Sequence, residues 1–127
     1  MSPHFNLPVI GSEQGKLWGT TKQAFSLNGI DAHVIHVEAG GYCSQHSHKS
    51  KWNRFVVVSG ELMIKQWQPD ADLPDVTVLS TNQICDIPPG MLHQFEAIDD
   101  VCAVEFYWTT LDPEDIDRNG TVGGMRD

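Results

Sequence analysis

A chain of 127 residues is long enough for one domain and too short for two ordinary ones. Eight basic residues against seventeen acidic ones give a formal net charge of -9, which argues against nucleic acid or an anionic membrane as a partner. No stretch approaches the roughly 20 apolar residues of a spanning helix, and residues 1–10 lack the features of a signal peptide. Three cysteines without CxxC spacing argue against a disulfide framework, so a cytoplasmic protein is expected.

Short apolar runs rich in β-branched and aromatic residues recur along the chain, about 8 to 12 positions apart, with turn residues between them. We predict strands over residues 32–37, 55–58, 62–67, 76–79, 84–87, 93–97 and 101–108. Ser59-Gly60 is placed as a tight hairpin turn would be, and residues 68–75, with two prolines, read as an exposed hairpin loop. Helical periodicity is absent, so the pattern predicts an all-β domain with little helix.

The domain is expected to occupy the whole chain, 1–127. Its core should lie at about residues 20–110, because the polar, glycine-rich stretch 111–127 is typical of a loosely attached tail.

Two histidines separated by one residue, His46 and His48, are the first sign of chemistry. On a β-strand, side chains two positions apart point to the same face, so both imidazoles can converge on one ion. His33 and His36 are three positions apart, which places them on opposite faces of a strand and makes them poor joint ligands.

The surroundings of this pair make it specific. Gly41, His46-Ser47-His48 and Gly60 match the first cupin motif at every position except its glutamate, and residues 88–93 (PPGMLH) match the PxGxxH of the second motif. The chain therefore resembles the cupin superfamily, which implies a single-domain, jelly-roll-type β-barrel. The resemblance also implies that His93 joins His46 and His48 around a divalent metal ion such as Fe, Zn, Mn or Ni.

The missing glutamate leaves the fourth position open. Counting back from Gly60 gives Asn53, or Trp52 with a shorter spacer. The centre is then a three-histidine site with Asn53 as a weak amide ligand or a neighbour of the ligands, or it has lost its metal. Three neutral imidazoles leave a formal charge of about +2 on a bound divalent ion, which favours an anionic small molecule. Lys49, Lys51 and Arg54 lie beside the motif and are candidates for binding it, although a solvated loop explains them equally well.

Residues 54–60 and 87–96 resemble the cupin domain of type II mannose-6-phosphate isomerases, and residues 104–106 and 114–118 are similar to the ending of that family. This resemblance implies a sugar-phosphate substrate, with Arg118 as an anion contact. Isomerisation also needs a base beside the carbonyl, for which Glu105 or Glu96 is available. Glu105 shares a strand face with Tyr107, and it is the better candidate if that face lines the cavity.

Two other functions stay open at this stage. Three-histidine cupins without the glutamate include iron dioxygenases of thiols and of β-diketones, and Cys43 and Tyr42 precede His46 closely enough to lie near such a site. Small cupins also serve as non-catalytic ligand-binding or sensor modules. A homodimer is plausible for a small cupin of either kind.

Overall fold

The computed structural model describes residues 13–109 and 114–126, and these residues form β-strands without a helix. The strands are β1 (Gln14–Lys16), β2 (Gly19–Leu27), β3 (Ile30–Val37), β4 (Trp52–Ser59), β5 (Leu62–Trp67), β6 (Asp75–Leu79), β7 (Ile84–Ile87), β8 (Leu92–Ala97) and β9 (Val101–Trp108). All seven strands predicted from the sequence are present, and the all-β prediction is confirmed.

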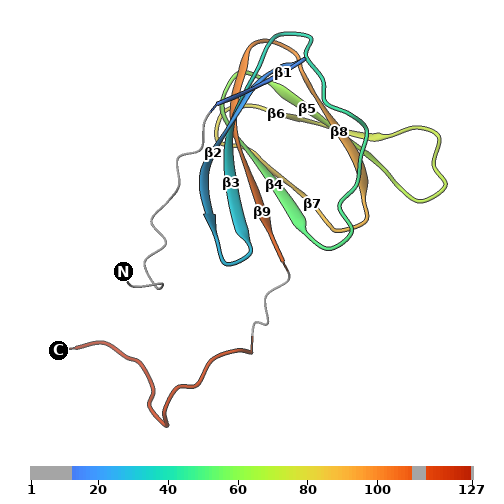
Figure 1. Cartoon of the computed structure of the whole chain (residues 1–127). Coiled ribbons are helices and arrows are strands. Elements are labelled where there is room, and N and C mark those ends of the chain that lie inside the picture. The colour runs from blue at the N-terminus through green and yellow to red at the C-terminus, as the bar shows by residue number, and fades with distance from the viewer. Residues whose placement is uncertain (1–12, 110–113, 127) are drawn as a thin grey trace.

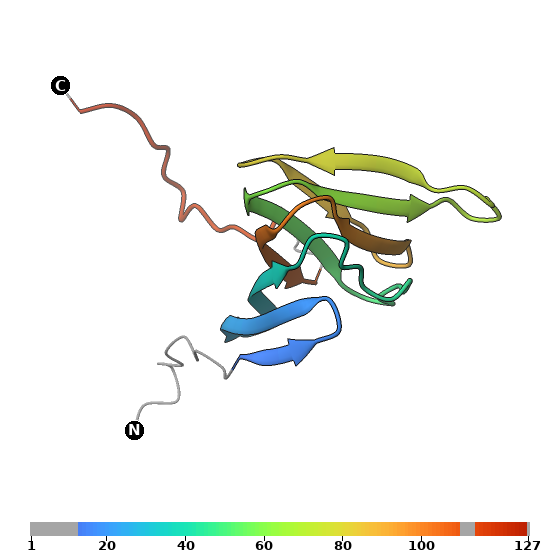
Figure 2. The same ribbon diagram turned by 90° about the horizontal axis from the view of Figure 1, so that it is seen from above.

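The strands make two antiparallel sheets that pack face to face as a jelly roll (Figure 1). The larger sheet has the order β1-β2-β3-β9-β4-β7, and the smaller one has the order β6-β5-β8. Seen from above, β5 and β6 form one layer, while β2 and its short partner β1 lie on the far side of the molecule (Figure 2).

The core fills the space between the two sheets. In β4, β8 and β9 every second side chain is buried, which is the alternation expected when one face of a strand covers a core. The fully buried apolar side chains come from both sheets and include Ile35, Phe55, Val57, Leu62, Ile64 and Ile87. These side chains form one continuous apolar cluster, so the strands are held together by burial as well as by their hydrogen bonds.

The first two strands were not among the predicted runs. Asn28 and Gly29 connect β2 to β3, and both have positive φ angles, 49° and 83°, as a two-residue hairpin turn of type I′ requires. β1 is a short, exposed edge strand that pairs only with β2 among the described strands. Together β1 and β2 form a hairpin at the edge of the larger sheet.

The predicted hairpin at Ser59-Gly60 is wrong. β4 pairs with β7 and β9 in the larger sheet, whereas β5 pairs with β6 and β8 in the smaller one, so this turn crosses from one sheet to the other. Gly60 has a φ of 86°, and a Cβ there would clash with the backbone carbonyl oxygen of Asp100. The amide of Glu61 also donates to Asp99 Oδ1 at 2.6 Å, so the crossing is fixed by the turn between β8 and β9.

The predicted loop at 68–75 does connect two paired strands, β5 and β6, and most of its residues are exposed. Residues 114–126 contain no strand and run away from the barrel (Figure 1). Positions 110–113 and 127, which include part of the predicted tail, lie outside the described residues. In the described part of the chain, no helix is long and apolar enough to cross a membrane.

Candidate metal centre and adjoining cavity

The inward side chains become polar at one end of the barrel. Asn53 lies at the start of β4, His93 near the start of β8 and Glu105 near the end of β9, and all three are buried. Because β4 and β9 are antiparallel, Asn53 stands opposite Tyr107 in the register. The alternation that builds the apolar core at one end therefore gathers these polar groups at the other.

The two cupin motifs meet through the backbone. The amide of His46 donates to the carbonyl oxygen of His93 at 3.0 Å, and the amide of His93 donates back to His46 at 2.8 Å. The segment around the HxH pair is not the regular strand assumed from the sequence. His46 forms only an isolated antiparallel bridge, and its partner is His93 of β8. Side chains of such a pair project to the same face, which brings the two rings together.

His46, His48 and His93 form a cluster that could hold a metal ion. One ring nitrogen of each lies within 4.8 Å of those of the other two. The ring centroids are 4.5 Å apart for His46 and His93, 5.0 Å for His46 and His48, and 5.4 Å for His48 and His93. Within the described residues this is the only group of three or more histidine, cysteine or acidic side chains with such spacing.

Backbone carbonyl groups fix two of these rings. The Nδ1 of His46 lies 2.7 Å from the carbonyl oxygen of Ser44, and the Nδ1 of His93 lies 2.8 Å from that of Met91. A carbonyl oxygen can only accept, so each Nδ1 carries the proton and donates. In the neutral form of either ring, Nε2 is then left as an acceptor, which is the form that binds a metal.

Burial keeps two of the three rings, those of His48 and His93, unprotonated. The pKa of His48 is lowered to about 4 by desolvation and then by the neighbouring His46, Lys51 and His93. The pKa of His93 is also lowered, mainly by desolvation, although its hydrogen bond to Met91 opposes the shift. Both rings are therefore neutral near pH 7, as metal ligation requires.

Three buried polar side-chain atoms have no hydrogen-bond partner among the described residues: Nε2 of His48, Nε2 of His93 and Oδ1 of Asn53. The amide nitrogen of Asn53 is 3.2 Å from the carbonyl oxygen of Phe106 and 3.5 Å from Oε2 of Glu105. Because the Phe106 oxygen can only accept, the NH2 group must face it, and Oδ1 is the atom left over. Trp52, the other possibility for the glutamate position, stacks on Trp108 instead.

Glu105 contacts the amide of Asn53, and the face of β9 that Glu105 shares with Tyr107 lines a cavity. The Tyr107 hydroxyl donates to Oε2 of Glu105 at 2.7 Å. Burial raises the pKa of Glu105, against the hydrogen bond from Tyr107, which lowers it. Burial, with the nearby Glu105, also raises the pKa of Tyr107, so its hydroxyl stays protonated.

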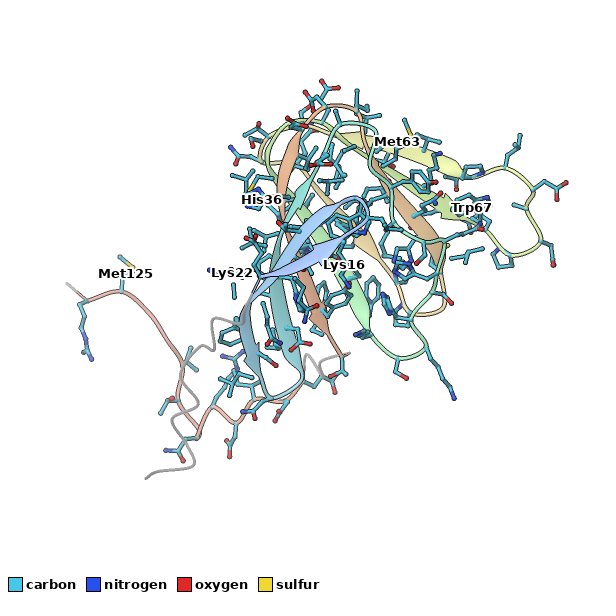
Figure 3. The ribbon with its side chains drawn as sticks, turned by 45° about the horizontal axis from the view of Figure 1, so that its top comes forward. Lys16, Lys22, His36, Met63, Trp67 and Met125 are labelled. Carbon is cyan, nitrogen blue, oxygen red and sulfur yellow. The ribbon has the colours of Figure 1, made fainter. Side chains whose placement is uncertain are left out.

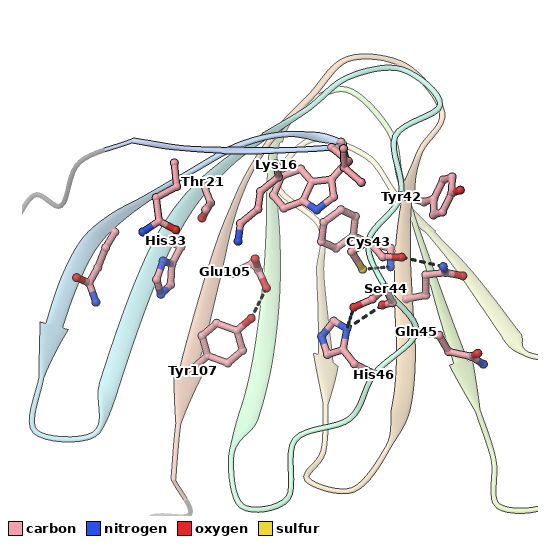
Figure 4. A pocket seen from close by; sticks show the side chains of 16 residues that line it. Lys16, Thr21, His33, Tyr42, Cys43, Ser44, Gln45, His46, Glu105 and Tyr107 are labelled. Carbon is pink, nitrogen blue, oxygen red and sulfur yellow. Dashed lines mark hydrogen bonds between the residues drawn. The ribbon is translucent and has the colours of Figure 1, made fainter.

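The cavity has a volume of about 1100 Å³ and lies between the β1–β2 hairpin and the segment of Tyr42 to His46 (Figure 4). It opens onto His46 on one side and onto Glu105 and Tyr107 on another. His33 and Lys16 also line it, whereas His36 does not. The inward positions of Ile35 and Val37 would have predicted that His33 faces the same way, but no local pattern marked Lys16.

The four basic residues predicted to bind an anion are not gathered at this cavity. Lys49 and Arg118 are exposed and do not line it. Arg54 makes two hydrogen bonds to Asp86, at 2.6 and 2.8 Å, on the opposite side of β4 from the buried Asn53. Lys51 alone approaches the site, with its ammonium group 4.3 Å from the ring centroid of Tyr107.

Comparison with solved structures identifies the fold. KdgF from Halomonas sp. superposes with a TM-score of 0.68 at 16% identity, over 80% of this chain and 88% of that one. An RmlC-like cupin from Shewanella frigidimarina NCIMB 400 gives 0.67 at 18% identity, over 90% and 96% of the two chains. The capsular polysaccharide assembling protein CapF from Staphylococcus aureus gives 0.70 at 21% identity over 88% of this chain, which spans only 31% of that protein.

No protein-family model matches the chain, and no curated protein matches it. The solved structures that it matches include the RmlC-like cupin above and the cupin domain of Cnp3 from Schizosaccharomyces pombe. The protein therefore has the all-β jelly-roll cupin fold, as the two motifs predicted.

Proposed function

We propose that this protein is a metal-binding cupin that holds a divalent ion through His46, His48 and His93 and acts on a small anionic or sugar-like molecule. The observation that carries this proposal is the pair of buried Nε2 atoms, in His48 and His93, that have no partner. A buried acceptor left unpaired costs about 1–3 kcal/mol, and a cation bound between the rings would remove that cost.

Asn53 completes the ligand set as an amide oxygen donor. Its NH2 group is taken by Phe106 and Glu105, so its buried Oδ1 is free to accept from, or bind to, a positive group. Three imidazoles and one amide carry no charge, and a divalent ion held by them keeps its formal +2 charge. This uncompensated charge would attract an anionic substrate into the adjoining cavity.

When bound, the ion supplies a Lewis acid that polarises an oxygen of the substrate. Glu105 is the proposed proton-transfer group, because it is a buried carboxyl on the cavity wall with a raised pKa. The Tyr107 hydroxyl donates to Oε2 of Glu105, and this hydrogen bond fixes the direction in which the other carboxyl oxygen, Oε1, points. This pairing fits isomerase-like proton transfer on a sugar-like substrate, and the fold likeness to a capsular polysaccharide assembling protein supports a sugar-like substrate.

The metal centre is tested by elemental analysis of protein purified without a histidine tag. About one ion of Fe, Zn, Mn or Ni per chain is expected, and a His46→Ala/His93→Ala double variant should lose it. His36→Ala is the matched control, because His36 is an exposed histidine outside the cluster and its loss should change nothing. A double variant that retains the ion would overturn the proposal, as would native protein that takes up none of the four ions.

The same purified protein distinguishes this proposal from two alternatives, an iron dioxygenase and a non-catalytic binding module. A three-histidine set without an acidic ligand also fits an iron dioxygenase, which requires iron and substrate-dependent oxygen uptake. Cys43 has a buried thiol on the cavity wall, and burial raises its pKa to about 11, so it stays a neutral thiol. Tight ligand binding without turnover would instead identify a binding module.

A further inference from the structure

The charge distribution around the cavity is uneven. Lys16 is the only lysine or arginine among the described residues that line it, and Glu105 is the only carboxylate. The Lys16 side chain reaches from β1 into the cavity on the side of Glu105 (Figure 4), whereas Lys22 and His36 lie on the other side of the sheet (Figure 3). Among the described residues, Lys16 makes no ion pair. A free ammonium group therefore faces a cavity whose other wall carries His46.

The rest of the lining mixes polar side chains with the apolar Leu17, Trp18 and Phe95. Thr21 and Gln23 project from β2, and Ser44 and Gln45 come from the segment before His46. Hydroxyl and amide side chains both donate and accept hydrogen bonds, which suits the hydroxyl groups of a small polar ligand. Lys16 is the one lysine or arginine of the described lining, and no helix N-terminus adjoins it.

This donor set favours a carboxylate over a phosphate. Phosphate sites in proteins gather several charged or N–H donors, such as arginine forks and helix N-termini, because the group is a dianion near neutral pH. A single lysine matches the single charge of a carboxylate. An ionised Glu105 on the same wall would repel a dianionic phosphate more strongly than a singly charged carboxylate.

The hairpin that carries Lys16 is fastened to the barrel. The ring of Trp18 packs edge-on against Phe95 of β8, with centroids 5.0 Å apart. The carbonyl oxygen of Trp18 accepts a hydrogen bond of 2.9 Å from the amide of Glu38. Because these contacts come just two residues after Lys16, they hold the root of its side chain at the edge of the cavity.

We infer that Lys16 is the specificity-determining residue of this cavity and binds the carboxylate of a small hydroxylated acid, whose other end reaches the histidine cluster. This inference rests on the proposed function, since it places the ligand beside the proposed metal centre. It narrows the substrate class from any anionic or sugar-like molecule to a sugar acid.

Three sugars that differ only at one carbon test this assignment: D-glucuronate, D-glucose and D-glucose 6-phosphate. Their dissociation constants are measured by calorimetry on protein loaded with one zinc per chain, and the zinc content is checked before and after. Glucuronate should bind at least about tenfold more tightly than either of the others, the scale of one charge-assisted hydrogen bond. Lys16→Gln should abolish that preference without changing the zinc content.

Two variants control the result. Lys49→Gln removes an exposed charge that does not line the cavity and should leave all three constants unchanged. Lys51→Gln tests the other nearby cation, and a larger loss of glucuronate binding there than in Lys16→Gln would overturn the assignment. The assignment also fails if zinc-loaded protein binds glucose 6-phosphate as tightly as glucuronate, or shows no preference for glucuronate. Failure to hold zinc would instead refute the proposed metal centre, so the two failures are distinguishable.

Discussion

Replacing Asn53 with aspartate should weaken the fold, although it restores an acidic residue near the position where cupins carry glutamate. The amide NH2 donates to the Phe106 carbonyl oxygen at 3.2 Å, and an ionised carboxylate has no hydrogen to offer there. Losing that bond costs about 1 kcal/mol, and leaving two buried acceptors facing each other costs about 1–3 kcal/mol more. We expect metal-free Asn53→Asp to lose about 2–4 kcal/mol of unfolding free energy at pH 8.

The deficit should depend on pH in a defined direction. Burial beside Glu105 raises the folded-state pKa of a carboxyl at this position above its unfolded value of about 3.9. The folded variant then binds its proton more tightly, so the loss is small at pH 4 and grows as the pH rises through the folded pKa. Urea unfolding at several pH values measures this, with Asn82→Asp in an exposed turn as the control. Wild-type stability of Asn53→Asp at pH 8 would refute the assigned orientation of the amide.

Three further predictions concern the site and the turn between the sheets. Metal-free protein should lose about 1–2 kcal/mol, allowing for solvent screening, as the pH falls from 6.5 towards 4, because the unfolded chain protonates His48 more readily than the folded one. Tyr107→Phe should lower the unfolding free energy by about 1.5 kcal/mol, since Glu105 loses its closest donor. Gly60→Ala should cost about 3 kcal/mol or more, against about 1–2 kcal/mol for Gly90→Ala, which has a similar φ and open space.

Each of these has a direct check by urea unfolding. The acid effect should shrink in a His48→Gln variant, and an unchanged pH profile would contradict the stated cause. The Tyr107→Phe deficit should be smaller at a pH where Glu105 is protonated, and equal deficits at all pH values would exclude the hydrogen bond to an ionised carboxylate. Equal costs for the two glycine substitutions would show that Gly60 is not confined by the facing turn.

The fold could be predicted from the sequence where local pattern carries the information. The seven strands with apolar, β-branched runs were found because the alternation is a property of each segment alone. β2 was missed because residues 19–23, Gly-Thr-Thr-Lys-Gln, carry no apolar run. The error at Ser59-Gly60 has a different origin. The turn residues indicate that the chain changes direction, but they do not indicate which sheet the next strand joins. That is decided by the pairing of β5 with β8, which begins more than thirty positions after Gly60.

Some residues of the candidate site could likewise be predicted from the sequence, and others could not. His46, His48 and His93 were recognisable from their spacing, and Glu105 from the face it shares with Tyr107. The inward orientation of Asn53 follows from the alternation along β4, in which Asn53 shares the buried face with Phe55 and Val57. The unbroken apolar run 55–58 does not reveal from the sequence which face is buried. Lys16 was missed because its place at the cavity depends on how the β1–β2 hairpin folds over the barrel, and no residue near it in the sequence signals that contact.

The irregular backbone around the HxH pair determines how the site can open. Asn53, His93 and Glu105 lie on strands paired within the sheets, so exposing them requires unfolding much of the barrel. The segment that carries His46 and His48 is instead held beside β8 by a few main-chain hydrogen bonds. Its amides should therefore exchange with solvent through local opening, well before the sheets open. The residence time of an ion in the cluster would then be set by the fraying of this one segment, and not by the stability of the whole domain.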